Sequence, residues 1–323
     1  MVRAFVLMSG GLDSALAAKL LLEQEVKVIG VVFTSYFFSP VERSRSLAKE
    51  LQIPLITVDI SEEHLKIVLS PPHGYGKNMN PCIDCHALML KKAKALMPEY
   101  NIDFIATGEV LGERTMSQNL NSLHIVEKEA GLNGMVLRPL SAGLLSPTFA
   151  ERMEMVDRTK LLSISGKSRK EQLRLASEYG ISGYSTPAGG CLLTDPGYSR
   201  RLRDLVKHDE ACGESVKLLK FGRHFRVNNS KIIIGRNEDE NLWMEKFSED
   251  GYTILRVEAY EGPITLVTNP TEQIISNYAV PLTIRYSDAP KDREITVLCG
   301  KSGKMTKIKG KSMTYETLGL KPI

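Results

Sequence analysis

Apolar runs alternate with amphipathic stretches along the first part of the chain. An apolar run over residues 4–8 leads through a glycine turn into a nearly all-apolar helical stretch over residues 15–23. Short apolar strands are predicted at 28–33 and 54–59, with an amphipathic helix over 41–51 between them. Strands that alternate with helices predict a parallel sheet covered on both faces, which binds its ligands at the carboxyl ends of the strands.

The same alternation continues for about two hundred residues and then changes. A loop rich in proline, glycine and asparagine precedes a helix predicted over 86–97, and a strand over 104–107 ends at Gly108. Beyond residue 210 the chain consists of short β-rich pieces and one helix, predicted over 238–247. We therefore expect two domains, residues 1–208 with an α/β fold built on a parallel sheet, and residues 209–323 with a smaller α+β fold.

The composition indicates a globular protein and excludes several other classes. Of the 323 residues, 42% are hydrophobic and 25% are charged, as in ordinary folded domains. No apolar run approaches the roughly 18 residues that cross a bilayer, and no signal peptide is evident, so we expect a cytoplasmic protein without a membrane partner. A net charge of only +4 means that any RNA binding must rest on local basic patches.

The motif after the first strand is the strongest sign of chemistry. It comprises Ser9, Gly10, Gly11, Asp13 and Ser14 around Leu12. Two glycines let the backbone turn tightly and point N–H groups at an anion beside a helix N-terminus. A carboxylate in such a place either faces Mg²⁺ or caps the helix, so a plain helix entry stays an alternative. No Walker A sequence follows the glycines.

The strand and its SGGLDS turn resemble the PP-loop ATP pyrophosphatases. That resemblance implies ATP and Mg²⁺ as ligands and a reaction that transfers AMP to a carbonyl-type oxygen, with pyrophosphate released. It implies that residues 9–14 bind ATP and that Asp13 takes part in catalysis. The resemblance covers about the first 200 residues and includes synthetases, tRNA-modifying enzymes and sulfur-inserting enzymes.

Five cysteines in a chain without a secretory signal favour metal, redox or catalytic roles over a disulfide framework. Cys82 and Cys85 form a CxxC pair, and Cys191 follows about a hundred residues later. Three thiols suit a [4Fe–4S] cluster with one open iron, or a nucleophile with a resolving partner, and structural zinc is a further alternative. We expect Cys212 and Cys299 to be small buried residues.

The stretch NPCIDCHALMLKKA, with IATGE downstream, resembles the tRNA thiouridylases. The resemblance implies that Cys85 and Cys191 are catalytic and that Gly108 and Phe33 contact ATP. Two departures from the 2-thiouridylase pattern, the extra Cys82 and a glutamate, Glu109, where a histidine is usual, resemble the thiolases that hold a cluster on three cysteines. The sulfur then arrives as a persulfide on a cysteine or as sulfide on the open iron, and the start of a helix favours a low-pKa thiolate at Cys85.

Candidate RNA contacts are spread over the second half of the chain. The segment FGRHFR, residues 221–226, mixes aromatic and cationic side chains, and basic clusters lie at 167–170, 200–203 and 301–311. With GRNEDEN at 235–241, this region resembles the RNA-binding domain of the NFACT family, which implies RNA as a partner.

Taken together, these features predict an ATP-dependent tRNA sulfurtransferase that forms thiouridine through an adenylated base, with sulfide or a persulfide carrier protein as sulfur donor. Arg114 and Arg138 each follow the end of a predicted strand. We expect each of them to contact either the nucleotide or a salt-bridge partner. Two alternatives stay open. One is a PP-loop enzyme with another acceptor and structural zinc on Cys82, Cys85 and Cys191. The other is a non-catalytic RNA-binding protein that a nucleotide regulates.

Overall fold

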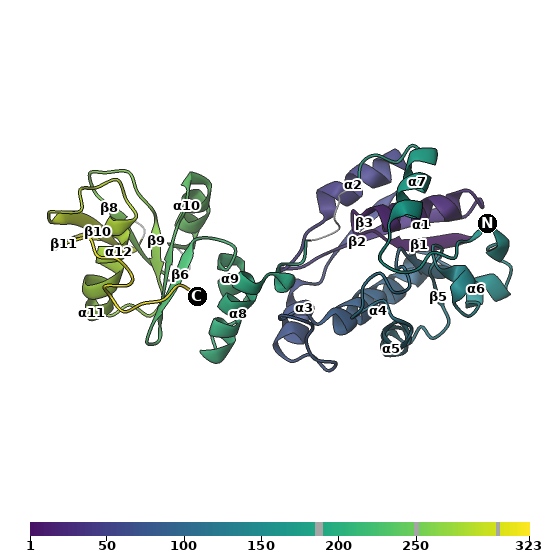
Figure 1. Ribbon diagram of the computed structural model, residues 1–323, viewed down its shortest axis with the longest axis horizontal. Coiled ribbons are helices and arrows are strands. Elements are labelled where there is room, and N and C mark those ends of the chain that lie inside the picture. The colour runs from purple at the N-terminus through teal and green to yellow at the C-terminus, as the bar shows by residue number, and fades with distance from the viewer. Residues whose placement is uncertain (185–189, 249–251, 302–303) are drawn as a thin grey trace. The chain divides into compact units, whose positions relative to one another are not determined.

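The computed structural model describes residues 1–184, 190–248, 252–301 and 304–323. Over these residues the chain forms two compact units, Met1–Asp195 and Pro196–Ile323 (Figure 1). No helix in the described ranges combines the length and the apolar character that crossing a membrane requires.

The N-terminal unit is built on a five-stranded parallel sheet with the strand order β3-β2-β1-β4-β5. Alternate residues of β1 face opposite sides, so Ala4 and Val6 join one core while Phe5 joins the other. All three side chains are buried, because a central parallel strand has helices on both faces. The strands are β1 (Arg3–Leu7), β2 (Lys27–Thr34), β3 (Leu55–Asp59), β4 (Phe104–Thr107) and β5 (Val136–Leu137).

Two sets of helices cover the faces of this sheet (Figure 1). Helices α1 (Leu12–Leu22), α2 (Val41–Glu50) and α7 (Lys170–Glu178) contribute to the first core, and α4 (Cys82–Tyr100) and α5 (Leu120–Ala130) to the second. Two shorter helices complete the unit, α3 (Ser61–Leu69) and α6 (Phe149–Arg152). The predicted α/β fold is confirmed.

Helix α4 begins four residues earlier than its hydrophobic pattern predicts. Its first residue is Cys82, and the backbone N–H of Cys85 donates to the carbonyl of Pro81 to close the first turn. Proline fits this position because its fixed φ matches a helix entry. Both thiols of the CxxC pair therefore lie on the first turn of a helix rather than in the preceding loop.

The C-terminal unit contains a six-stranded antiparallel sheet with the order β11-β10-β8-β9-β7-β6. Its apolar face packs on α12, which confirms the predicted smaller α+β domain. The elements are α8 (Pro196–Lys207), α9 (Gly213–Leu218), β6 (Arg223–Val227), β7 (Ser230–Ile234), α10 (Glu238–Glu245), β8 (Thr253–Val257), β9 (Thr265–Val267), α11 (Glu272–Ile274), the π-helix η5 (Ile275–Ala279), α12 (Val280–Arg285), β10 (Ile295–Lys301) and β11 (Lys304–Gly310).

The compact units divide before α8, whereas the sequence predicts a boundary between Val206 and Lys217. Helix α8 lies with the C-terminal unit because Asp204 pairs with two cations of its sheet. Arg226 Nη2 of β6 is 2.6 Å from Asp204 Oδ2, and Lys231 Nζ of β7 is 3.2 Å from the same oxygen.

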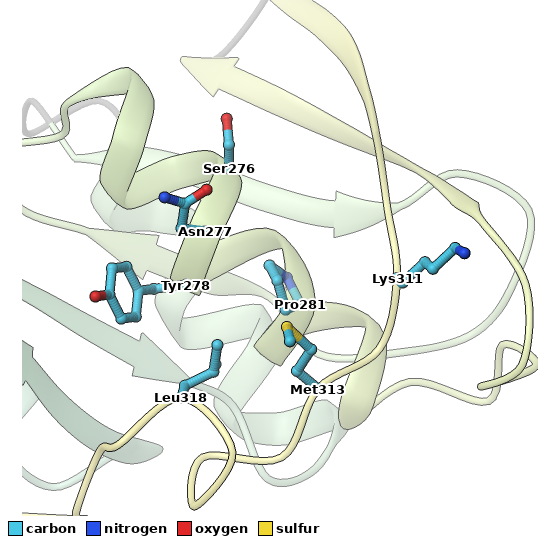
Figure 2. Close-up of a pocket in the computed structure, with 7 residues that line it drawn as sticks. All are labelled: Ser276, Asn277, Tyr278, Pro281, Lys311, Met313 and Leu318. Atoms are coloured by element: carbon cyan, nitrogen blue, oxygen red, sulfur yellow. The ribbon is translucent and has the colours of Figure 1, made fainter.

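A pocket of about 480 Å³ lies beside the π-helix of the C-terminal unit (Figure 2). Its lining combines one cation, an amide, a hydroxyl, a phenol and apolar groups, and consists of Ser276, Asn277, Tyr278, Pro281, Lys311, Met313 and Leu318. None of the predicted catalytic or nucleotide-binding residues belongs to it.

We predict that the stability of the protein depends on the titration of Lys231. Burial lowers the pKa of Lys231 from its usual 10.5 to about 8, although the Asp204 carboxylate opposes the shift. The unfolded chain therefore binds more protons than the folded chain between these values, so the free energy of unfolding should rise with pH across that window. Urea unfolding at pH 7.5 and pH 10, compared with a Lys231→Met variant, checks this. Equal pH dependence in the two proteins would contradict it.

Candidate functional site

The glycine turn lies at the carboxyl end of β1, the central strand of the parallel sheet. Gly10 has a φ of +72°, and a Cβ there would come within 2.8 Å of Arg43 Cβ. Helix α1 starts directly after Gly11 without a side-chain cap. The alternative in which the Asp13 carboxylate caps the helix is therefore not formed, and the N–H groups at this helix start are available to an anion.

Ser14 shapes the turn from within. Its hydroxyl, which is buried, donates to the carbonyl of Gly11 at 2.8 Å and accepts from the backbone N–H of Ser9 at 3.3 Å. Ser14 thus fixes the turn conformation, and the hydroxyl of the exposed Ser9 donates to Ser14 Oγ at 3.4 Å.

Asp13 lies on the first turn of α1 in a polar, largely buried environment. Burial raises its pKa, although the charges of Arg169 and Arg114 oppose the shift. Arg169 Nη2 is 3.8 Å from Asp13 Oδ2, whereas Asp13 Oδ1 is buried and accepts no hydrogen bond within the described part of the chain. A buried carboxylate oxygen without a donor fits a cation ligand such as Mg²⁺.

Gly108, at the end of β4, contacts the same turn. A Cβ at this position would lie 2.4 Å from Ser14 N and 2.5 Å from the carbonyl carbon of Asp13. Such a separation leaves no room for any side chain, so glycine is required for β4 to approach the turn. Phe33, the other residue expected near ATP, is 3% exposed and belongs to the core between the sheet and α4.

The three candidate cysteines come together at the start of α4. Cys82 and Cys85 occupy its first turn, and the backbone N–H of Leu192, next to Cys191, donates to the carbonyl of Phe37 just beyond β2. Charges on Cys82 and Cys191 both raise the pKa of Cys85, which places all three sulfurs within electrostatic reach of one another.

The expected low-pKa thiolate at Cys85 is wrong. Burial, followed by the charges of Cys191, Cys82 and Asp84, raises the pKa of Cys85 well above its usual range. Burial likewise raises the pKa of Cys191 to about 11. Desolvation of a buried thiolate therefore outweighs the helix start that favours it.

The other two cysteines differ from each other. Cys299 is buried, as predicted, but Cys212 is exposed at the start of α9, and the prediction of a buried residue there is wrong. Within the described ranges, no three side chains of His, Cys, Asp or Glu are arranged to hold one metal ion.

A buried ion network connects the ends of β4 and β5 with α5. Arg138 Nε donates to Glu109 Oε2 at 3.0 Å, and Arg138 Nη1 pairs with Glu127 of α5. Burial alone would raise the pKa of Glu109, but Arg138, His86 and Thr107 outweigh it and bring the pKa to about 2. Of the two roles considered for Arg138, the structure shows the salt bridge.

His86 extends this network toward the thiols. It follows Cys85 in α4, and its Nδ1 lies 3.0 Å from Glu109 Oε1. The sequence alone gave no reason to connect His86 with Glu109, because the two are brought together only when α4 packs on β4. A histidine oriented by a carboxylate can accept and return a proton at its other nitrogen.

The charge of Arg114 acts on both candidate centres. Its charge lowers the pKa of Asp13 on the glycine turn and also that of Cys191. Since charge effects of this kind fall off with distance, the Arg114 guanidinium lies within electrostatic range of both the glycine turn and Cys191.

Most of the FGRHFR segment is unavailable to RNA. Phe225 and His224 are buried in the unit, and Arg226 is held by Asp204 and Glu210, with Nη2 to Glu210 Oε2 at 2.7 Å. Phe221 and Arg223 are half-buried: Phe221 stacks on Trp243, and the Arg223 guanidinium lies over the ring of Tyr286, 4.6 Å from its centroid.

The basic clusters differ in their availability to RNA. In the first, Lys167 and Lys170 are exposed, whereas Arg169 lies at the glycine turn. In the second, Arg200 and Arg203 are exposed, whereas Arg201 bonds the carbonyl of Leu219. The lysines over 301–311 are exposed along β10 and β11 and after them, and residues 302–303 of that stretch lie outside the described ranges.

Arg169 and Gln172 are residues near Asp13 that the sequence prediction did not connect with the glycine turn. Both lie at the start of α7, which packs beside α1, and both act on Asp13. Arg169 belongs to the basic cluster at 167–170, which the sequence analysis assigned to RNA contacts. Its position beside Asp13 depends on tertiary packing, so the sequence alone could not reveal it.

We predict that Cys212 reacts with iodoacetamide before Cys85 at pH 8. Cys212 is exposed, whereas Cys85 is buried with a raised pKa, and each pKa unit lowers the thiolate fraction by about tenfold. Timed alkylation followed by peptide mass spectrometry should show Cys85 modified at least about tenfold more slowly. Faster modification of Cys85 would show that its thiolate is stabilised after all.

We also predict that Arg138→Met strongly destabilises the protein. The substitution leaves two buried carboxylates, Glu109 and Glu127, without their cation, at a cost of about 3–5 kcal/mol. The matched control is Arg174→Met, which removes an arginine of similar pairing whose side chain is 52% exposed, and should have little effect. Denaturant unfolding of both variants measures the difference, and similar values for the two would contradict the prediction.

Two family models match this chain. Residues 2–144 match "Thiamine biosynthesis protein (ThiI)", and residues 222–321 match "NFACT protein RNA binding domain". The first range includes the glycine turn, Gly108 and the CxxC pair, and the second includes β6 to β11.

Curated relatives match mainly the N-terminal unit. "tRNA-specific 2-thiouridylase MnmA" of Dehalococcoides mccartyi is 33% identical over 138 residues, which is 38% of this chain and 37% of that protein. The protein of the same name from Rickettsia typhi is 24% identical over 336 residues, or 93% of this chain and 89% of that protein. The chain spans about a third of the length of several such relatives, between 34% and 37%.

Among solved structures, a 4-thiouridine synthetase in complex with RNA and bound ATP covers 67% of this chain and 53% of its own, at 20% identity and a TM-score of 0.40. The family matches agree with the fold and with the residues that carry the sequence resemblance. Residues 2–144 are therefore similar to the PP-loop domain of the ThiI family, and residues 222–321 are similar to the RNA-binding domain of NFACT proteins.

Proposed function

We propose that this protein is a tRNA sulfurtransferase that uses ATP to activate a uridine oxygen and replaces that oxygen with sulfur. The observation that carries the proposal is the placement of the thiols. The charge of Arg114 acts on both Asp13 of the glycine turn and Cys191, and Cys191 in turn acts on Cys85, so an activated base and a sulfur carrier can meet at one edge of the sheet.

The glycine turn is the proposed ATP site. It offers an uncapped helix start and an exposed Ser9, and Gly108 brings the end of β4 against it. Arg169, 3.8 Å from Asp13, adds a guanidinium suited to phosphate oxygens. Phe33 keeps its proposed nucleotide role on the family resemblance alone.

Asp13 is the proposed Mg²⁺ ligand, since its Oδ1 is buried without a hydrogen-bond donor in the described residues. When bound, Mg²⁺ neutralises charge on the pyrophosphate that leaves. The neighbouring arginines and the backbone N–H groups of the turn stabilise the same charge from fixed positions.

The chemistry follows from the poor leaving ability of a carbonyl oxygen. Attack of that uridine oxygen on the α-phosphate of ATP forms an adenylate and releases pyrophosphate. Sulfur then attacks the ring carbon and displaces AMP. His86, oriented by Glu109 next to Cys85, is placed to take up and return the protons of this exchange.

A persulfide is the sulfur route that we propose. One of Cys85 and Cys191 carries the sulfur, and the other cleaves the sulfur–sulfur bond after transfer, which leaves thiouridine and a disulfide that a thiol reductant resets. The donor of the persulfide is a carrier protein that itself bears a persulfide, whereas inorganic sulfide serves by attacking the Cys85–Cys191 disulfide, which gives a persulfide on one cysteine and a free thiol on the other. We derive no step through an iron–sulfur cluster or zinc, because the described side chains form no ligand group for either.

The proposed RNA partner is a tRNA, which the C-terminal domain would hold through its NFACT-type fold. An enzyme that consumes ATP and works with reduced thiols suits the cytoplasm, where disulfides are rare.

The test is an anaerobic incubation of the full chain with ATP, Mg²⁺, sulfide and unmodified tRNA, followed by nucleoside mass spectrometry and a pyrophosphate assay. We expect ATP-dependent thiouridine. Cys85→Ser and Cys191→Ser should abolish thiouridine but keep pyrophosphate release, and Asp13→Asn should lower both by at least about 100-fold. Cys212→Ser is the matched control and should retain full activity.

Other outcomes favour other functions. Pyrophosphate release without sulfur gain would indicate another acceptor, and loss of folding in Cys191→Ser together with bound zinc would assign the cysteines a structural role. RNA binding with neither product would identify a binding protein. Stoichiometric iron and acid-labile sulfide after anaerobic purification would replace the persulfide route with a cluster.

A further inference from the structure

The C-terminal unit has an exposed aromatic surface that the proposed reaction does not use. Trp243, on α10, is the one tryptophan of the sequence, and 53% of it is exposed. Its indole stacks on the ring of Phe221, with centroids 6.1 Å apart and planes inclined by 14°. The Lys246 ammonium lies over the indole, 4.4 Å from its centroid. We call Phe221, Trp243 and Lys246 the Trp243 surface.

A small apolar core fixes the position of this surface. Phe221 packs against a small core formed by Leu218, Met244 and other apolar side chains, so its ring has a fixed position. Trp243 does not belong to that core. A large aromatic side chain left half in water contributes little to folding, and such exposure in a rigid setting is typical of a binding surface.

The charges around the Trp243 surface suit an anion. Lys220 directly precedes Phe221, and burial together with repulsion by Lys217 lowers its pKa, so two ammonium groups lie close to each other there. Two carboxylates of α10 are paired, Glu240 with Arg236 and Glu245 with Arg256 at 3.7 Å, whereas Glu238 and Asp239 in its first turn form no ion pair with a described residue. The acidic first turn of α10 directs a polyanion toward the Lys246 end of the helix.

We propose that the Trp243 surface binds an unpaired base of RNA, with the base stacked on the indole in place of the Lys246 ammonium, which turns to one flanking phosphate while Lys220 binds the other. Every base has a π-face, so stacking on an aromatic ring supplies affinity without sequence specificity, and lysines add the phosphate contacts. The inference rests on the proposed function only in taking RNA as the partner. The family match names an RNA-binding domain but assigns no residue to the contact.

An unpaired base fits better than a duplex. In an A-form helix the base faces are covered by their neighbours, so a single indole on the surface cannot stack on them. Loops and ends of a folded RNA expose their bases, and a tRNA contains several such places.

The test uses the single tryptophan as its own reporter. The full chain is titrated with a short oligouridine, with a duplex of equal length and with unmodified tRNA, all without ATP or a sulfur donor. We expect quenching of tryptophan emission by oligouridine and tRNA, with weaker binding of the duplex. Trp243→Ala should weaken both RNA affinities by about tenfold, whereas Trp243→Phe should retain most of the affinity.

Two further variants separate stacking from general surface effects. Leu242→Ala removes the neighbouring side chain, which is 58% exposed, and should bind RNA as the parent protein does. Lys246→Gln should lower the slope of log affinity against log salt by about 0.7, the loss of one phosphate contact on a single strand. Melting curves of all variants check that each one folds.

Unchanged RNA affinity in a folded Trp243→Ala protein would overturn the proposal, as would unchanged tryptophan emission at saturating RNA. Loss of affinity in Tyr278→Ala alone would assign binding to the pocket of Figure 2 instead. The proposal would also be overturned if the chain bound no RNA and Trp243 contacted a partner protein instead.

These RNA-binding measurements do not depend on whether the protein forms thiouridine. A protein that stacks RNA on Trp243 but forms no thiouridine would contradict the proposed function and leave this inference standing.

Discussion

A buried guanidinium joins the elements on which the candidate site depends. Arg138, at the end of β5, bonds Glu109 after β4 and Glu127 on α5, and Glu109 in turn holds His86 on α4. Each carboxylate would be costly in this buried position without a partner, so the four elements are held in one arrangement. The first turn of α4, which carries the CxxC pair, is therefore positioned by an ion network rather than by apolar packing alone.

That arrangement has a chemical consequence for the thiols. Burial fixes where Cys85 and Cys191 lie, but it also keeps their pKa values high, so neither sulfur is an activated thiolate in the protein alone. A sulfur attached to either cysteine as a persulfide is a stronger acid and nucleophile than the thiol itself. Activation then comes from the sulfur that arrives and not from the helix on which the cysteine sits.

The fold was largely predictable because its signals are local. The alternation of apolar strands with amphipathic helices, the glycine turn and the Asn237 cap of α10 each depend on neighbouring residues, and each is present in the structure. The site was predictable only in part. The sequence indicated which residue types carry the chemistry, but the pairing of His86 with Glu109, the contact of Arg169 with Asp13 and the exposure of Cys212 arise from packing between distant segments.

The attachment of α8 to the C-terminal sheet determines where this chain can be divided. A gene fragment that starts at residue 209, where the strand pattern changes, would omit Asp204. Lys231 and Arg226 would then lose the carboxylate that they share. The buried ammonium of Lys231 would have to lose its proton, or β7 would have to unfold to expose it to water. A fragment that starts at Pro196 retains the whole ion cluster. Helix α8, which lies before the strands of the sheet, therefore belongs to the smallest fragment that keeps these ion pairs.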